Sequence, residues 1–120
     1  MKKLFFLVSI LALVISCSYD NEEVLYGLCD TEVISYAEVI EPIIQTNCNS
    51  GCHFGDTPSG ALSLDSYEAV KSNAENPGYD GLINRIERTT GSGLMPPSGR
   101  LTQCQIDQII AWVDQGALNN

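Results

Sequence analysis

The sequence predicts an all-α fold, and two observations carry that prediction. Several segments repeat apolar residues at the spacing of one helix face, and each begins with residues that cap helices well. The stretches between these segments are rich in glycine, proline and small polar residues, which favour turns. The chain has 120 residues, so it forms one domain at most.

The first 28 residues are expected to lie outside that domain. Residues 1–16 join a basic start to an apolar run that is too short to cross a bilayer, as in a secretory signal peptide. The run ends before Cys17 in a pattern that resembles a bacterial lipobox, which implies cleavage there and lipidation of Cys17. An ordinary signal peptide cleaved nearby is the alternative. Residues 17–28 would then be an acidic tether, and the protein would be exported and lipid-anchored to the cell envelope, at the outer membrane or cell surface, with the periplasmic side left open.

The first helix of the domain is expected at residues 35–47. Ser35 and Glu38 have the spacing of a capping box. Pro42 lies inside the segment, so the helix either kinks there or restarts with the proline in its first turn. Its apolar stripe consists of Val39, Ile40, Ile43 and Ile44.

Two shorter helices are expected in the middle of the chain. One begins at the capping pattern of residues 65–68 and ends near Ser72. The other is capped by Asp80 and has an apolar face formed by Leu82, Ile83 and Ile86. Residues 61–64, which precede the first of them, are expected to be extended.

The last helix has the clearest signals in the chain. Thr102 and Gln105 form a capping box at its start, and Gly116 is a natural residue to end it. Its apolar face consists of Ile106, Ile109, Ile110 and Val113. Residues 89–100, just before it, hold three glycines and two prolines and are expected to form a loop.

One short segment carries the chemistry that the sequence suggests. It places Cys48 and Cys52 directly before His53, which is the only histidine of the chain. Two thiols followed at once by an imidazole can hold a c-type haem, because the thiols form thioethers to the porphyrin edge and the histidine ligates the iron. The usual spacing is C-x-x-C-H, whereas this chain has one more residue between the cysteines. Asn49, Ser50 and Gly51 are small enough to bulge around it.

A haem iron in a small electron carrier needs a second axial ligand, and Met95 is the candidate. It is the only methionine besides Met1, and it lies in the loop before the last helix. Pro96 and Pro97 would stiffen that loop and so lower the entropy lost on holding a ligand in place. The alternative is that Met95 only packs against its neighbours.

These features, taken in order, resemble a known family. The haem-type motif is followed by Gly60–Tyr67, Leu82–Ile86, Leu94–Pro97 and, after Leu101, Ile110–Ala117. This order is similar to that of the small class I-type monohaem cytochrome c domains found in lipoproteins of Bacteroidetes and Planctomycetes. The resemblance covers nearly all of residues 29–120.

The resemblance implies a cytochrome c-like helical fold around one covalent haem c. Cys48 and Cys52 would attach the haem, and His53 and Met95 would be its axial ligands. The terminal helices of such domains pack together, so Cys29 and Cys104 are expected to form a disulfide; two free thiols would be unusual in an exported protein. Arg85, Arg88 and Arg100 are candidate partners of the haem propionates, and Tyr67 and Trp112 are expected to pack around the haem.

Charge limits the partners of the mature chain. The part from Cys17 onward keeps all 15 acidic residues but only four of the six basic ones, so its formal charge is −11. Such an acidic surface argues against nucleic acid and favours redox proteins with a basic surface.

The leading interpretation is therefore a lipid-anchored carrier of single electrons, without catalytic activity of its own. Two alternatives remain open at this point. A haem sensor or haem enzyme would have Met95 displaced by a small ligand. A haem-free lipoprotein would be stabilised by a disulfide, or by zinc on Cys48, Cys52 and His53 with Cys29 or Cys104 as the fourth ligand.

Overall fold

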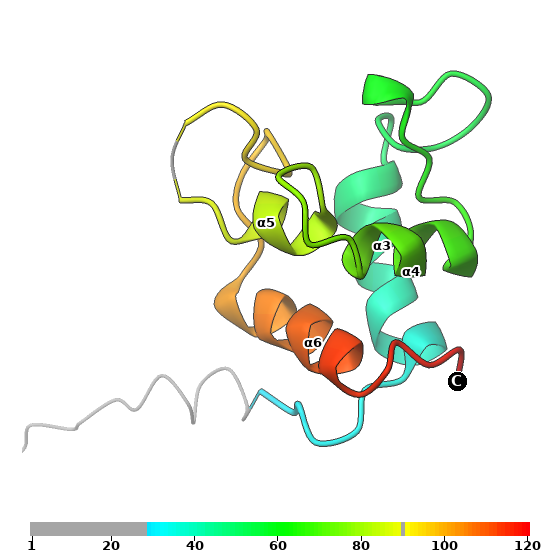
Figure 1. Cartoon of the computed structure of the whole chain (residues 1–120), viewed down its shortest axis with the longest axis vertical. Coiled ribbons are helices and arrows are strands. Elements are labelled where there is room, and N and C mark those ends of the chain that lie inside the picture. The colour runs from blue at the N-terminus through cyan, green and yellow to red at the C-terminus, as the bar shows by residue number, and fades with distance from the viewer. Residues whose placement is uncertain (1–28, 90) are drawn as a thin grey trace, which may run out of the picture.

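The computed structural model describes residues 29–89 and 91–120 (Figure 1). Within these residues the domain is built from helices and contains no strand, which confirms the all-α class. The predicted signal peptide, the predicted lipidation site at Cys17 and the predicted tether lie outside the described residues. None of the described helices is long and apolar enough to cross a membrane.

The helical segments follow one another in a simple order. They are η1 (Tyr36–Ile40), α3 (Glu41–Ile44), η2 (Gln45–Asn49), η3 (Ser59–Ala61), α4 (Tyr67–Ala74), α5 (Leu82–Ile86) and α6 (Gln103–Asp114). The first three form one continuous run, because the residues at both junctions keep right-handed helical backbone angles. Figure 1 shows this run crossing behind α4, with α6 packed across its lower end.

The first run absorbs Pro42 without a break. Ser35 is the N-cap, and its hydroxyl accepts a hydrogen bond from the Glu38 amide, as one half of the predicted capping box. The turns on both sides of α3 have the wider π geometry, and Pro42 is the second residue of α3. The helix also continues two residues beyond the predicted end, so Cys48 lies on it.

The two middle helices are both present, with one correction. Ser66 caps α4 through its hydroxyl, and α4 ends at Ala74, two residues later than predicted. Asp80 does not cap α5: the N-cap is Gly81, which makes no side-chain bond, and the Asp80 carboxylate pairs instead with the Arg85 guanidinium. Of residues 61–64, Ala61 is not extended, because it ends η3 with a positive φ of 55°.

The last helix begins and ends as its sequence predicts. Thr102 and Gln105 exchange both hydrogen bonds of a capping box. At the other end Gly116 has a φ of 95°, the Gly116 amide donates to Val113, and the Ala117 amide donates to Trp112. This pair of bonds is the Schellman arrangement, which satisfies carbonyls that the helix end would otherwise leave without partners.

An aromatic cluster lies where α6 meets the first run. Trp112 is completely buried, and its ring centroid is 5.5 Å from that of Tyr36 and 6.4 Å from that of Tyr67. Its indole N–H donates to the Leu118 carbonyl, and the Tyr67 hydroxyl donates to the Ala117 carbonyl. The polar groups of these buried rings thus fix the C-terminal segment.

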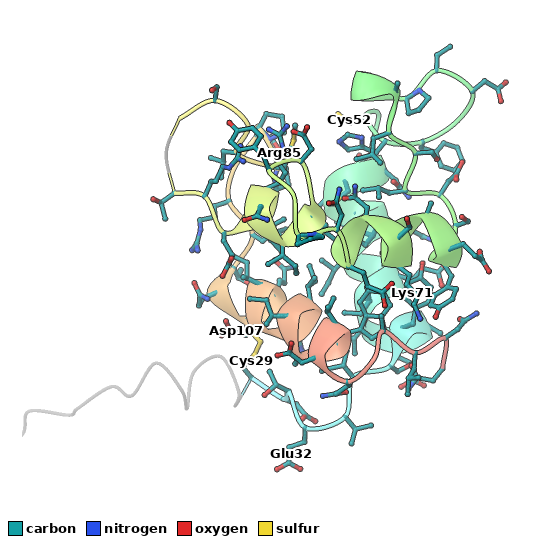
Figure 2. The ribbon with its side chains drawn as sticks, in the orientation of Figure 1. Cys29, Glu32, Cys52, Lys71, Arg85 and Asp107 are labelled. Atoms are coloured by element: carbon teal, nitrogen blue, oxygen red, sulfur yellow. A yellow bond between two sulfur atoms is a disulfide. The ribbon has the colours of Figure 1, made fainter. Side chains whose placement is uncertain are left out.

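Both ends of the described domain are held by contacts with α6, with the residue that follows it, or with η1. Cys29 and Cys104 are joined by a disulfide with a sulfur–sulfur distance of 2.10 Å, near the start of α6 (Figure 2). The side chain of Gln115 accepts from the Ile34 amide and donates to the Thr31 carbonyl. Asn120 accepts hydrogen bonds from the amides of Tyr36 and Ala37 at the start of η1. These ties close the base of the domain.

Candidate functional site

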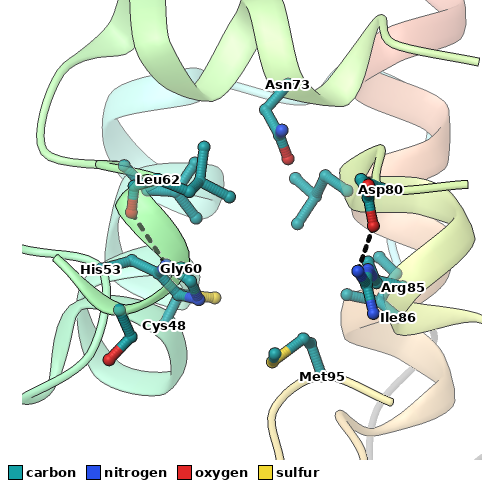
Figure 3. A pocket seen from close by; sticks show the side chains of 12 residues that line it. Cys48, His53, Gly60, Leu62, Asn73, Asp80, Arg85, Ile86 and Met95 are labelled. Atoms are coloured by element: carbon teal, nitrogen blue, oxygen red, sulfur yellow. Dashed lines mark hydrogen bonds and ion pairs between the residues drawn. The ribbon is translucent and has the colours of Figure 1, made fainter. Parts of the chain in front are cut away.

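A cleft lies at the end of the domain opposite this base. Two adjoining cavities, of about 390 and 380 Å³, share Cys48, His53, Ser59 and Met95 in their walls. Each is within the size range of small-molecule and cofactor pockets. Figure 3 shows His53 and Cys48 on one side of the larger cavity and Met95 on the other. The cavity between them is lined mainly by apolar side chains, which include Leu62, Leu64, Leu82 and Ile86.

His53 is held in a defined orientation. Its Nδ1 atom lies 2.9 Å from the carbonyl oxygen of Leu62. Because a carbonyl oxygen can only accept a hydrogen bond, Nδ1 must carry the proton, and Nε2 then has the free lone pair. The backbone supports this arrangement, since the Leu64 amide donates to the His53 carbonyl at 2.8 Å. A histidine fixed in this tautomer is prepared to ligate a metal through Nε2.

The extra residue between the two cysteines is absorbed by a wide helical turn. The His53 amide donates to the Cys48 carbonyl at 3.1 Å, which is five residues back instead of the four of an α-helix. Gly51 allows the turn with a φ of 82°, where a side chain would be strained. The predicted bulge is therefore a π-type turn that follows the end of η2 at Asn49.

The two thiols of this turn differ in exposure and are both free. Cys48 is buried at 8% exposure, whereas Cys52 is partly exposed. Burial raises the pKa of the Cys48 thiol to about 11, and the charge of Cys52 adds a smaller repulsion. The four described cysteines thus divide into one disulfide at the base and two thiols at the cleft.

Asn49 joins this turn to the wall that supports His53. Its Nδ2 atom donates to the Leu64 carbonyl at 3.0 Å. This carbonyl lies two residues after that of Leu62, which accepts the hydrogen bond from His53 Nδ1. Neither this role of Asn49 nor that of the Leu62 carbonyl was indicated by the sequence. A backbone carbonyl has no residue type of its own, so the sequence carried no signal for this wall beyond the expectation that residues 61–64 are extended.

Met95 reaches the cleft from the loop between α5 and α6. Its amide donates to the Arg85 carbonyl at 3.2 Å, and its partly buried side chain lines both cavities. In Figure 3 the thioether lies on the side of Met95 that faces Cys48 and His53. The structure therefore brings together Cys48, Cys52, His53 and Met95 around one cleft.

Of the three candidate arginines, only Arg85 lines either of these two cavities. Its guanidinium pairs with Asp80 and donates to the Gly93 carbonyl at 3.1 Å. Arg88 stacks on Tyr79, with 3.7 Å from its guanidinium carbon to the ring centroid. Arg100 donates to the side chain of Gln103. Arg88 and Arg100 are therefore engaged elsewhere than in the cavity walls.

Two other expectations are not met. Tyr67 and Trp112 line neither cavity, because they are packed in the aromatic cluster at the base. In the part of the chain that the structure describes, no three His, Cys, Asp or Glu side chains converge as metal ligands. The disulfide also engages Cys29 and Cys104, which were the proposed sources of a fourth zinc ligand.

Comparison of the chain with protein-family models, with curated proteins and with solved structures found no match.

Proposed function

We propose that the protein is a monohaem c-type cytochrome, exported and lipid-anchored through Cys17, that carries single electrons between redox proteins. One observation supports this proposal above all. A histidine whose Nδ1 is bonded to the Leu62 carbonyl lies across an apolar cleft from a methionine, and two free cysteines lie immediately before that histidine. Few functions other than haem binding call for these four groups at one cavity.

The residues of the cleft fit the group that they would hold. Cys48 and Cys52 would form the two thioethers, His53 would ligate through Nε2, and Met95 would ligate from the opposite wall. The adjoining cavities and their apolar walls suit a flat, largely apolar ring. When bound, haem c supplies a one-electron iron couple. Arg85 would offer its guanidinium to an acidic edge group from the cavity wall.

The chain's own residues would set the behaviour of that couple. The Leu62 carbonyl keeps the His53 proton on Nδ1 and strengthens the imidazole as a ligand. A methionine ligand raises the potential relative to ligation by histidine alone. Because His53 and Met95 would fill both axial positions, no position would be open to a substrate. These features favour a carrier over an enzyme or a sensor.

Electrostatics indicates the kind of partner. The mature chain has a formal charge of −11, so its field would attract redox proteins with a basic surface and repel nucleic acid. Association with such a partner should weaken as salt screens the attraction.

A direct test is to produce the full chain together with a periplasmic haem-attachment system. The expected result is a covalent haem signal on a denaturing gel, lost in the Cys48→Ala/Cys52→Ala double variant. The reduced wild type should bind carbon monoxide poorly, because Met95 would already ligate the iron. Met95→Ala should bind it readily and should lack the near-infrared sulfur-to-iron band.

The outcomes separate the proposal from its rivals. A wild-type protein without covalent haem would refute the proposal and favour the haem-free lipoprotein. A haem-loaded wild type that binds carbon monoxide as fast as Met95→Ala would favour a sensor or enzyme. Retention of haem on the gel after loss of both cysteines would refute the attachment sites.

A further inference from the structure

Arg85 holds the loop that carries Met95 at two points. Its main-chain carbonyl accepts the Met95 amide at 3.2 Å, and its guanidinium Nη1 donates to the Gly93 carbonyl at 3.1 Å. The other guanidinium nitrogen, Nη2, pairs with Asp80. Arg85 thus makes hydrogen bonds to the loop on both sides of Leu94, and the carboxylate of Asp80 orients its guanidinium.

Glycine is the only residue type that fits this arrangement at position 93. A Cβ at position 93 would collide with Nη1 of both Arg85 and Arg88, and the φ of 89° would strain any side chain. The guanidinium of Arg85 therefore lies directly against the loop backbone. Any residue other than glycine at position 93 would displace these two guanidinium groups and would strain the backbone.

The helix that carries Arg85 is firmly anchored. Leu82 and Ile86 of α5 are 4% and 0% exposed, and both belong to the hydrophobic core. The loop has no such anchors, because Pro96 is its only buried residue among residues 87–89 and 91–100. Position is therefore transmitted from α5 to the loop, and Arg85 is the residue that transmits it.

We propose that Arg85 is a positioning residue for Met95: it fixes the loop to α5 so that the thioether is held facing His53 across the cleft. This role rests on the proposed haem function and extends it. Arg85 acts here through the loop backbone, so its effect on Met95 is distinct from any pairing with an acidic group of the ligand.

Displacement of Met95 by imidazole from solution tests this role. The apparent affinity of the oxidised protein for imidazole rises with the fraction of molecules in which Met95 is detached. Arg85→Gln removes the charged donor to Gly93, and the net worth of such a bond predicts a gain of about tenfold in apparent imidazole affinity. Amide exchange of Met95 in the reduced protein should become faster by a similar factor.

Two variants separate the hydrogen bonds of Arg85 to the loop from other effects of charge. Arg88→Gln removes the same charge from the same region, together with bonds of 3.3 Å to the Ser92 carbonyl and 2.8 Å to the Tyr79 carbonyl. Arg88 lies close to Gly93 but makes no hydrogen bond to it and lines neither cavity. Arg88→Gln should leave both readouts within about twofold of wild type, as expected for a weak, exposed contact. Arg85→Lys keeps the charge without the two-pronged geometry and should recover only part of the effect.

The proposal would be overturned if Arg85→Gln bound imidazole and exchanged the Met95 amide as wild type does. It would also be overturned if Arg88→Gln matched Arg85→Gln, since charge alone would then explain both. A change in reduction potential without a change in imidazole affinity would mean that Arg85 acts only on the ligand edge. If the protein carried no haem, the proposed function would fail, but amide exchange at Met95 in the protein as isolated would still decide whether Arg85 holds the loop.

Discussion

The base of the domain and the walls of its cleft are held together by different forces. The base consists of η1, α6 and residues 115–120, and its centre is the buried aromatic cluster around Trp112. We call the two loops that carry His53 and Met95, residues 50–64 and 91–99, the walls. They contain one residue of the buried hydrophobic core, Leu64, whereas the core residues Leu82 and Ile86 line the cavity from α5.

Hydrogen bonds to backbone carbonyls add to the limited apolar burial in these two loops, where Leu64 and Pro96 are the buried residues. The His53 ring bonds to Leu62, Asn49 bonds to Leu64, and Arg85 bonds to Gly93. Each such bond contributes about 1 kcal/mol net, or somewhat more when the donor is charged, whereas burying a large side chain contributes more. The base can therefore maintain the fold, while the walls can be altered at small cost. This division predicts that substitutions in the base change stability and substitutions in the walls change the site.

The largest effect is expected at Trp112. Trp112→Ala would remove a fully buried side chain that touches two aromatic rings, and we expect a loss of about 3–5 kcal/mol in the free energy of unfolding. Denaturant unfolding monitored by circular dichroism measures this loss. Trp112→Phe keeps an aromatic ring but loses the bond to the Leu118 carbonyl, so its loss should be smaller. A loss below about 1 kcal/mol in Trp112→Ala would contradict the assignment of the base as the stability centre.

The disulfide should make the second strongest contribution to the stability of the base. It links residues 75 positions apart, and replacement of both cysteines in Cys29→Ser/Cys104→Ser should cost about 2–5 kcal/mol. Denaturant unfolding measures this loss, and the haem content of the same preparation is measured as well. Because the disulfide lies away from the cleft, haem content per folded molecule should stay unchanged. A variant that kept its stability but lost haem would contradict the claim that the base sets stability and the walls set the site.

The thiols of the cleft give a test of pH dependence. Because burial raises the pKa of Cys48 to about 11, alkylation of the thiol in haem-free Cys52→Ser protein should be on the order of a hundredfold slower at pH 8 than in urea, where an ordinary thiol pKa applies. The Cys48 thiol therefore keeps its proton up to a higher pH in the folded state than in the unfolded state. The free energy of unfolding should therefore fall as the pH rises from about 8.5 towards about 11. Equal alkylation rates in buffer and in urea would show that Cys48 is not buried in the haem-free chain.

Local chemistry explains which parts of the fold could be predicted from the sequence. The ends of α6 are correct because Thr102, Gln105 and Gly116 act on backbone groups within a few residues. Asp80 was wrongly predicted to cap α5, because Arg85 competes for its carboxylate and that pairing is a tertiary contact. Capping signals are reliable only where no such partner intervenes.

The site shows the same limit more strongly. The pattern of Cys48, Cys52 and His53 is visible in the sequence, and so is the lone thioether of Met95. The groups that orient them are the carbonyls of Leu62, Leu64 and Gly93, and a backbone carbonyl is the same in every residue. Trp112 was misplaced for a related reason. The helical period shows which face of α6 is buried, but it does not show against which partner.

The smallest expected effect on stability tests how the walls act on the site. Asn49→Ala removes the bond to Leu64, but it also removes the buried Oδ1 atom, which accepts no hydrogen bond from any described residue. The two changes partly offset each other, so we expect a loss of about 1 kcal/mol or less in the free energy of unfolding. Asn47→Ala is the comparison variant, because Asn47 also lines the cleft but donates its 2.8 Å bond to Ile43 within its own helix and not to the wall that supports His53. Freed from Asn49, the wall that carries the Leu62 carbonyl should bond less well to His53, which would raise the reduction potential of the haem-loaded protein by weakening the imidazole as a ligand. Equal potentials in the two asparagine variants would mean that the wall holds His53 without the help of Asn49.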